Sequence, residues 1–246
     1  MIFPELDNNT LRRRRNAYGY PAVCLTGDLK LLEEVEFAST RELDEHLNRL
    51  LRSDLDDEVI AGYLGVIFWG FASGADGKDR RPRAHARVRL AQNGMDRVVL
   101  GKSQRIRGIA DLGVQYVAGN IRGAIRKLDN EEYSEALKDL IQLPQAKMAF
   151  ASKVCAFISP DKCGVIDTVI VNNYPQLGFS QKKTKTGKKG DVKDTVANIG
   201  MYREYCTWLQ ETAELLNQDA DNRQWTDRDG AKRSWRALDV ERSLYN

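Results

Sequence analysis

Apolar residues recur every three or four positions over much of this chain, which is the period of a helix that buries one face. The repeat is first clear between residues 29 and 55, where it consists of Leu43, Leu47, Leu50, Leu51 and Leu55. Ser39 and Glu42 have the spacing of a capping box, so a helix is expected to begin there. The next segment, 59–71, is apolar nearly all round and predicts a central buried helix whose glycines permit close packing.

Further helices are expected, in chain order, at residues 83–92, 103–128, 130–143, 149–158, 168–174, 195–218 and 234–246. Asp129 or Asn130 is the expected N-cap of the helix that ends near residue 143. Alternation typical of strands is scarce, and a hairpin at Asn93–Gly94 ranks below a helix that ends there. The pattern therefore predicts a mainly α-helical, multi-helix globule with little or no β-sheet.

The chain has 246 residues, which suits one large domain or two small ones. We expect residues 1–30 to form an N-terminal segment, in which 16–28 has the pattern of a loop or a short extended piece, and 31–246 to form one helical domain. No apolar run reaches the roughly 18 residues of a membrane span, and no N-terminal signal peptide is visible, so a cytoplasmic protein is predicted. The cysteines form no CxxC pair, which argues against a metal site; they are Cys24, Cys155, Cys163 and Cys206.

Basic residues are concentrated in a few runs, although the formal net charge is only +3. These runs are Arg12–Arg15, Arg80–Arg89, Arg105 with Arg107, and Lys182–Lys189. Acidic residues lie mostly elsewhere, so a nearly neutral total is compatible with one basic face that meets phosphates. The alternative for each run is a solvated loop or helix face.

Two charged residues occur in segments that otherwise have the pattern of a buried core. Lys153 lies near the start of the apolar helix in "AFASKVCAFI", and Asp167 is placed as the N-cap of the apolar helix "TVIVNN". Pro160 and Gly164 break the chain between them. Alone, the lysine is explained by a long side chain that reaches solvent and the aspartate by an ordinary cap. Together, after "LPQAKMAFAS", they favour a functional pair.

This helix–turn–helix–turn–helix arrangement resembles the helix-hairpin-helix DNA glycosylases, in particular the 8-oxoguanine glycosylase-like branch. "LPQAKMAFASK" is similar to the family's hairpin and lysine, and "GVIDTVIVNN" to its aspartate-led helix. The resemblance is best over roughly residues 59–174, with the hairpin at about 133–160; "YLGVIFWGFASG" and "WRALDVERSLY" are also family-like. The chain departs from the family in two respects: its hairpin lacks closely spaced glycines, and its lysine-to-aspartate span is shorter.

The resemblance implies that Lys153 and Asp167 are the catalytic residues. Breaking an N-glycosidic bond builds positive charge on the deoxyribose, which the carboxylate of Asp167 would stabilise. The amine of Lys153 would attack C1′ and form a Schiff base, and β-elimination would then nick the strand.

Contacts to DNA are expected at the hairpin and at the basic loop 181–193. The candidates are Gln145, Ala146, Lys147 and Met148 in the hairpin, and Lys182, Lys183, Lys185, Lys188 and Lys189 in the loop. A plain disordered insertion is the alternative for the loop. No metal or other cofactor is expected, apart from a monovalent cation considered at the hairpin carbonyls.

A base that is flipped out of the stack needs flat or apolar walls. The weak candidates for such walls are Phe150, Phe157, Tyr202 and Trp208, for which core packing is the alternative. The predicted function is a monomeric DNA glycosylase with AP-lyase activity on double-stranded DNA that contains a modified base, with an oxidised purine such as 8-oxoguanine favoured. Alternatives are a glycosylase for another modified base, such as a modified cytosine in foreign DNA, a non-catalytic DNA-binding module, and an accessory protein on a decayed glycosylase fold.

Overall fold

The computed structural model describes residues 1–29, 31–72, 79–99, 102–183 and 189–245. Its helices are α1 (Asn8–Asn16), α2 (Thr40–Leu51), α3 (Asp56–Ala72), α4 (Arg81–Asn93), α5 (Ile109–Leu112), α6 (Val114–Asp129), α7 (Tyr133–Ile141), α8 (Met148–Ile158), α9 (Thr168–Asn173), η1 (Pro175–Leu177), α10 (Val196–Gln218) and α11 (Ala237–Leu244). Its strands are β1 (Val23–Asp28), β2 (Leu31–Glu36), β3 (Met95–Val99), β4 (Lys102–Ile106), β5 (Gln181–Lys183), β6 (Lys189–Val192), β7 (Trp225–Thr226) and β8 (Lys232–Arg233).

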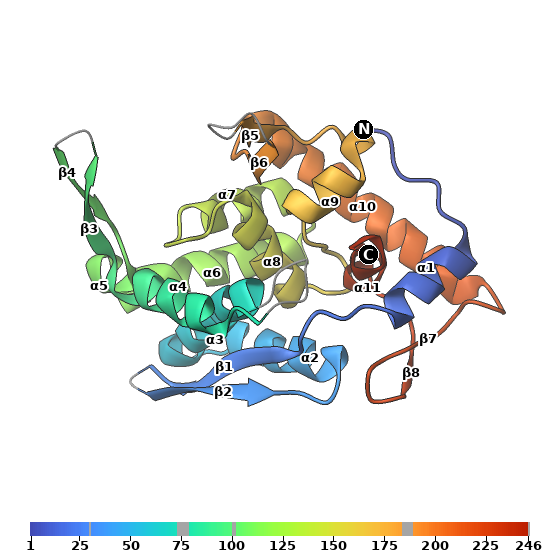
Figure 1. Ribbon diagram of the computed structural model, residues 1–246, viewed down its shortest axis with the longest axis horizontal. Coiled ribbons are helices and arrows are strands. Elements are labelled where there is room, and N and C mark those ends of the chain that lie inside the picture. The colour runs from blue at the N-terminus through green and yellow to red at the C-terminus, as the bar shows by residue number, and fades with distance from the viewer. Residues whose placement is uncertain (30, 73–78, 100–101, 184–188, 246) are drawn as a thin grey trace.

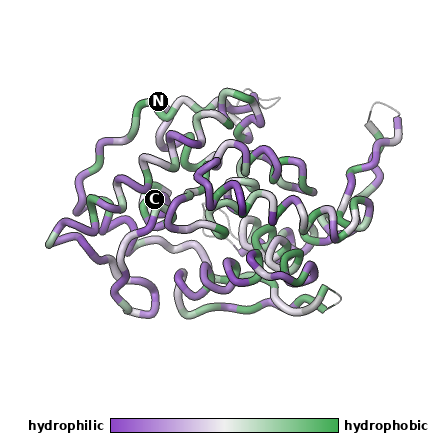
Figure 2. Tube along the Cα trace, turned by 180° about the vertical axis from the view of Figure 1, so that it is seen from behind, coloured by the Kyte–Doolittle hydropathy of each residue, from purple (hydrophilic) through white to green (hydrophobic). Residues whose placement is uncertain are grey.

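The described residues are mainly helical, which confirms the predicted fold class (Figure 1). The strands form antiparallel pairs, each a separate two-stranded sheet of consecutive strands. Apolar and polar positions alternate along the outer helices in Figure 2, as expected of helices that bury one face. Among the described residues, no helix combines the length and the apolar character that a membrane crossing requires.

Helix α3 is the centre of the fold, as its continuous apolar sequence predicts. It packs against α2, α4, α6, α8 and β1, and its residues from Val59 to Trp69 are buried. Glycines allow the close approach to α2: a Cβ added at Gly62 would lie 2.9 Å from Cβ of Leu50, and one at Gly65 would lie 2.8 Å from Cδ2 of Leu47. The predicted role of these glycines is therefore confirmed.

Helix α2 begins at the predicted capping residue. The Ser39 hydroxyl accepts a hydrogen bond from the Glu42 amide at 3.1 Å, and the Glu42 carboxylate accepts one from the Ala38 amide at 3.0 Å. Upstream, however, residues 31–36 form strand β2 and do not extend the helical segment. Their local leucine spacing was compatible with a helix, but they pair with β1 in register from Val23↔Glu36 onward.

The expected end of α4 at Asn93–Gly94 is confirmed, whereas the helix expected from residue 103 is wrong. Gly94, with φ of 66°, ends α4, and the hairpin lies further along the chain, where β3 pairs with β4. Residues 102–106 are therefore a strand, where a helix was expected from residue 103. This β3–β4 ribbon projects away from the helices in Figure 1, so packing against them did not select its conformation.

The predicted N-cap of α7 is also wrong. Glu132 occupies the N-cap position and its side chain accepts no capping hydrogen bond, whereas Asn130 is the C-cap of α6. The turn between these helices contains Glu131 with φ of 63°. The polar residues from Asp129 to Asn130, which were expected to begin α7, therefore belong to the end of α6 and this tight turn.

The N-terminal segment contributes to the core. Leu11 on α1 and Val23 on β1 are buried in the same apolar cluster as α3, and α1 packs against α11. Arg15, one member of the basic run that was expected to meet phosphates, is only 2% exposed and pairs with Asp239 on α11 at 3.0 Å. For Arg15, the solvated or phosphate-binding interpretation is therefore wrong.

Candidate functional site

The turn between α7 and α8 has the backbone conformation that a glycine usually provides. Gln145 has φ of 65°, in the left-handed region that favours glycine. Its side-chain oxygen accepts a hydrogen bond from Arg87 of α4 at 3.2 Å, and the Ala146 amide donates to the Leu143 carbonyl at 3.1 Å. The turn is thus closed with a glutamine where the resembled family has glycine.

Lys153 lies on the middle turn of α8, and the expectation that it lies near the helix start is therefore corrected. It is the sixth of eleven helix residues, and its side chain is only 7% exposed. Its aliphatic stem passes Gly70 of α3, where an added Cβ would lie 3.1 Å from Cδ of the lysine. The Nζ atom lies 5.3 Å from the centre of the Phe150 ring, close enough for a cation–π contact.

The two carboxylate oxygens of Asp167 have different partners. Oδ1 accepts hydrogen bonds from the amides of Val169 at 2.9 Å and Ile170 at 3.2 Å, so the predicted N-cap of α9 is confirmed. Oδ2 lies 3.2 Å from Nζ of Lys153. The cap fixes the orientation of the carboxylate, and the ion pair follows from that orientation.

The Asp167 segment is held against α8 and α10 by Ser152 and Tyr205, which the sequence did not single out, and by Tyr202, which was expected to line a base pocket. The Ser152 hydroxyl accepts a hydrogen bond from the Ile166 amide at 3.0 Å. From α10, the Tyr202 hydroxyl donates to the Gly164 carbonyl at 3.0 Å and the Tyr205 hydroxyl donates to the Val165 carbonyl at 3.2 Å. A serine next to the lysine was a weak signal in the sequence, and the tyrosine contacts depend on tertiary packing alone.

The predicted base-pocket aromatics lie in different places. Tyr202 is fully buried and Phe157 is 1% exposed. The Phe157 ring packs edge-on against Trp69, with ring centres 5.0 Å apart. Both are therefore core residues, and the prediction that they form a pocket wall is wrong. Trp208 stacks on Phe3 at 5.0 Å and lines a separate cavity on α10. Phe150 alone of the four lies beside both Lys153 and the cavity described next.

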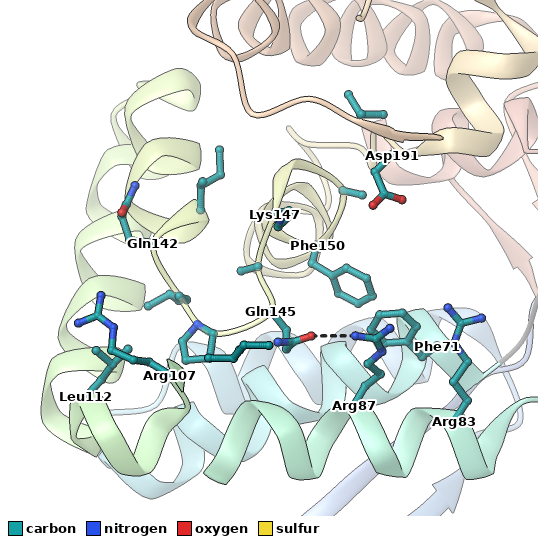
Figure 3. Close-up of a pocket in the computed structure, with 17 residues that line it drawn as sticks. Phe71, Arg83, Arg87, Arg107, Leu112, Gln142, Gln145, Lys147, Phe150 and Asp191 are labelled. Atoms are coloured by element: carbon teal, nitrogen blue, oxygen red, sulfur yellow. Dashed lines mark hydrogen bonds between the residues drawn. The ribbon is translucent and has the colours of Figure 1, made fainter. Parts of the chain in front are cut away.

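A cavity of about 530 Å³ opens next to the α7–α8 turn (Figure 3). Phe71 of α3 and Phe150 of α8 form a stacked pair at one side of it, with ring centres 4.5 Å apart and an interplanar angle of 24°. Lys153 and Asp167 do not line this cavity; the Phe150 ring connects it to their ion pair. The cavity and the ion pair are therefore neighbours on the two sides of Phe150.

The charged groups that line the cavity are mostly cations: Arg83, Arg87, Arg107 and Lys147, with Asp191 as the acid. The guanidinium groups of Arg83 and Arg87 lie 5.5 Å and 5.1 Å from the Phe71 ring centre, and Arg87 also donates to Gln145. Within the described residues, neither Arg107 nor Lys147 has a carboxylate partner within ion-pair distance. This combination of free cations and a flat aromatic pair suits a phosphate or a nucleotide.

The backbone amides proposed for DNA contact are already engaged. The Met148 amide donates to Oδ1 of Asp194 at 2.7 Å, and the Lys147 amide donates to the Gln145 carbonyl at 3.2 Å. The carbonyl of Pro144 accepts the Tyr63 hydroxyl. A phosphate would have to displace Asp194 to reach the N-terminus of α8, and a cation would have to share its carbonyls with these donors.

The basic loop is only partly described. Lys182 and Lys183 belong to β5 and the backbone of Lys189 begins β6, while Lys185 and Lys188 lie outside the described residues. Strand β6 packs against α8 and α9, so this hairpin flanks the helices that hold Lys153 and Asp167.

The described residues were also searched for metal-ligand clusters, and the whole chain was compared with known proteins. In the described part of the chain, no three histidine, cysteine, aspartate or glutamate side chains are grouped so that they could hold a metal ion. No family model, no curated protein and no solved structure matches this chain.

Proposed function

We propose that this protein is a DNA glycosylase with AP-lyase activity, in which Lys153 and Asp167 act on one deoxyribose. The observation that supports the proposal is the 3.2 Å contact between the Lys153 amine and the Asp167 carboxylate, which come from two different helices across an irregular segment. A buried amine that faces a fixed carboxylate, beside a basic cavity with an aromatic pair, is suited to sugar chemistry on a nucleic acid.

Each member of the pair has a defined part in the reaction. As the bond to the base breaks, positive charge develops on the sugar, and the carboxylate of Asp167 stabilises it. The neutral amine of Lys153 attacks C1′ and forms a Schiff base, from which β-elimination cleaves the strand. Since Oδ1 of Asp167 is held by the first turn of α9, the charge needed in the transition state is already oriented before substrate binds.

The α7–α8 turn would serve as the hairpin of a helix-hairpin-helix motif. The observation that supports this role is the left-handed backbone of Gln145, which lets the turn close without a glycine. Arg107 and Lys147, which face the adjacent cavity, would meet the DNA backbone near this turn. Strand β4 ends at Ile106, directly before Arg107, and the β3–β4 ribbon projects away from the helices (Figure 1).

The excised base remains a proposal that rests on the resemblance alone. An oxidised purine such as 8-oxoguanine is favoured, and another modified base, such as a modified cytosine, is the alternative. Because Phe157 and Tyr202 are core residues, the walls of the base pocket must come from other side chains.

The decisive experiment is a panel of duplexes, each with one modified base, incubated with the protein and scored for abasic sites. Borohydride added during the incubation should trap a covalent protein–DNA adduct through Lys153. Lys153→Gln should abolish trapping, while Lys138→Gln, which removes an exposed lysine of α7 that pairs with Glu135, should leave it unchanged.

The glycosylase proposal is wrong if the wild-type protein releases no base and forms no adduct with an abasic site, and if Lys153→Gln and Asp167→Asn give the same results as wild type. Salt-dependent duplex binding in that case would identify a non-catalytic DNA-binding module. Absent binding would leave an accessory protein on a glycosylase-like fold.

A further inference from the structure

Glu241 on α11 is a buried acid that has no role in the reaction proposed above. Its side chain is 3% exposed, and no hydrogen bond or ion pair of its carboxyl is found among the described residues. The neighbouring charges of α11, in contrast, are all paired: Asp239 with Arg236, and Arg242 with Asp44. An unpaired glutamate is almost never buried, because loss of hydration disfavours its charged form.

Helix α11 runs beside the segment that positions Asp167. The Leu238 amide donates to the Pro160 carbonyl at 3.0 Å at one end, and the Asn173 side chain donates to the Leu244 carbonyl at 3.5 Å at the other. Between these contacts, a Cβ added at Gly164 would lie 3.0 Å from Cβ of Glu241. Glu241 therefore packs on the middle of the segment that leads to Asp167.

The charged and titratable groups around Glu241 come from every element packed against it: Lys153 of α8, Asp167 before α9, Arg242 of α11, Arg15 of α1, and the tyrosines Tyr18, Tyr205 and Tyr245. Burial first, and then the charge of Asp167, raise the pKa of the Glu241 carboxyl to about 8, while Arg242, Lys153 and Arg15 lower it in part. The carboxyl is thus mostly protonated at neutral pH.

We propose that Glu241 is the third ionisable group of the Lys153–Asp167 site and that the charge of its carboxyl controls how readily Lys153 becomes a neutral amine. The inference rests on the proposed function. Glu241 is a positioning residue in this scheme, since it acts on the sugar only through the lysine.

The direction of the effect follows from the charges. Before attack, the Lys153 ammonium must lose one proton to solvent so that the nitrogen lone pair can bond to C1′. With Glu241 protonated, Asp167 is the single negative charge that favours the ammonium. When Glu241 ionises, a second negative charge holds the proton on the lysine, and the fraction of free amine falls. Neutral Glu241 therefore keeps the nucleophile available.

The test compares Glu241→Gln, which mimics the neutral acid, with wild type and with Glu214→Gln, the same change at an exposed site on α10. Borohydride trapping is measured on a duplex with one abasic site from pH 6 to 9.5, and the ratio of rates at each pH cancels the chemistry of the reductant. We expect Glu241→Gln to match wild type at pH 6 and to exceed it on the order of tenfold above pH 8. A ratio that does not change with pH overturns the inference while the glycosylase assignment stands.

A second measurement needs no DNA. Carbon-13 NMR of the carboxyl groups, with the signal of Glu241 assigned by its loss in Glu241→Gln, should give a titration midpoint near 8. The midpoint should rise in Lys153→Met and fall in Asp167→Asn, because the lysine favours the charged carboxylate and the aspartate opposes it. A midpoint near 4.5 that neither variant moves overturns the inference even if no activity is found.

Discussion

Asp44 of α2 and Arg242 of α11 form a bidentate ion pair that is closed off from solvent. Oδ1 of the aspartate lies 2.5 Å from Nη2 of the arginine and Oδ2 lies 2.9 Å from Nη1, with both side chains at most 1% exposed. The pair joins residues 198 positions apart and holds α11, with Glu241, against the body of the protein.

Replacing Asp44 with alanine should therefore be severe. The substitution leaves Arg242 and Arg236 as buried charges without this partner, and the free energy of unfolding should fall by about 3–5 kcal/mol. Urea unfolding followed by circular dichroism measures the loss. The matched control is Asp129→Ala, which breaks an exposed pair with Arg52 and should cost less than about 1 kcal/mol. Equal losses in the two variants would contradict the importance given to burial.

Asp167→Asn should separate the two parts of the reaction. The asparagine oxygen can still accept the amides of Val169 and Ile170, so α9 stays capped and the fold is retained. Base release should fall by roughly 10²- to 10³-fold, because the negative charge opposite the sugar is gone. Trapping on a preformed abasic site should persist, since no base has to leave. Loss of both activities, measured in the two assays side by side, would show that the aspartate acts chiefly by orienting Lys153.

Gly70→Ala should displace the lysine without changing any charged group. The added Cβ would lie 2.6 Å from Cε1 of Phe150 and 3.1 Å from Cδ of Lys153, so the ring and the lysine stem must both move. A shift of about 1 Å is enough to slow trapping by about 10²-fold. The rate of borohydride trapping on an abasic duplex measures the effect.

Gly119→Ala is the control for that experiment. This residue is exposed on α6, and a Cβ there would meet nothing within 4 Å. The change should leave trapping unaltered and raise the free energy of unfolding by about 0.5–1 kcal/mol, because alanine is the better helix former. A slowed Gly119→Ala variant would mean that the loss in Gly70→Ala is not specific to the site.

Duplex binding should depend on Arg107 and Lys147. If each contacts one phosphate, alanine at either position should reduce the slope of log affinity against log salt by about 1, as measured by fluorescence anisotropy of an undamaged duplex. Lys232→Ala, at an exposed position on the distant β7–β8 hairpin, should leave the slope unchanged (Figure 1). A uniform change in all three variants would reflect total charge and not a defined surface.

The proximity of Lys153 and Asp167 could be predicted from sequence because its signals are local. About 30 residues contain all of these signals: an apolar helix with one lysine, a proline–glycine break, and an aspartate at the start of the next apolar helix. Asp167 caps α9 as expected. The base-pocket aromatics could not be predicted in this way. Spacing marks Phe157 and Tyr202 as apolar helix residues, but only packing decides whether such a face meets the core or a cavity.

The sequence by itself determined where most helices lie, which of them is central and which lysine and aspartate are paired, because helical periodicity and capping depend on neighbours within a few residues. Tertiary structure decided the strand pairs, the burial of Arg15, the remote cap that Asp194 gives to α8 and the packing of Glu241 on Gly164. These features either join residues that are far apart in the chain or depend on the exclusion of solvent. A local sequence pattern contains no information about either.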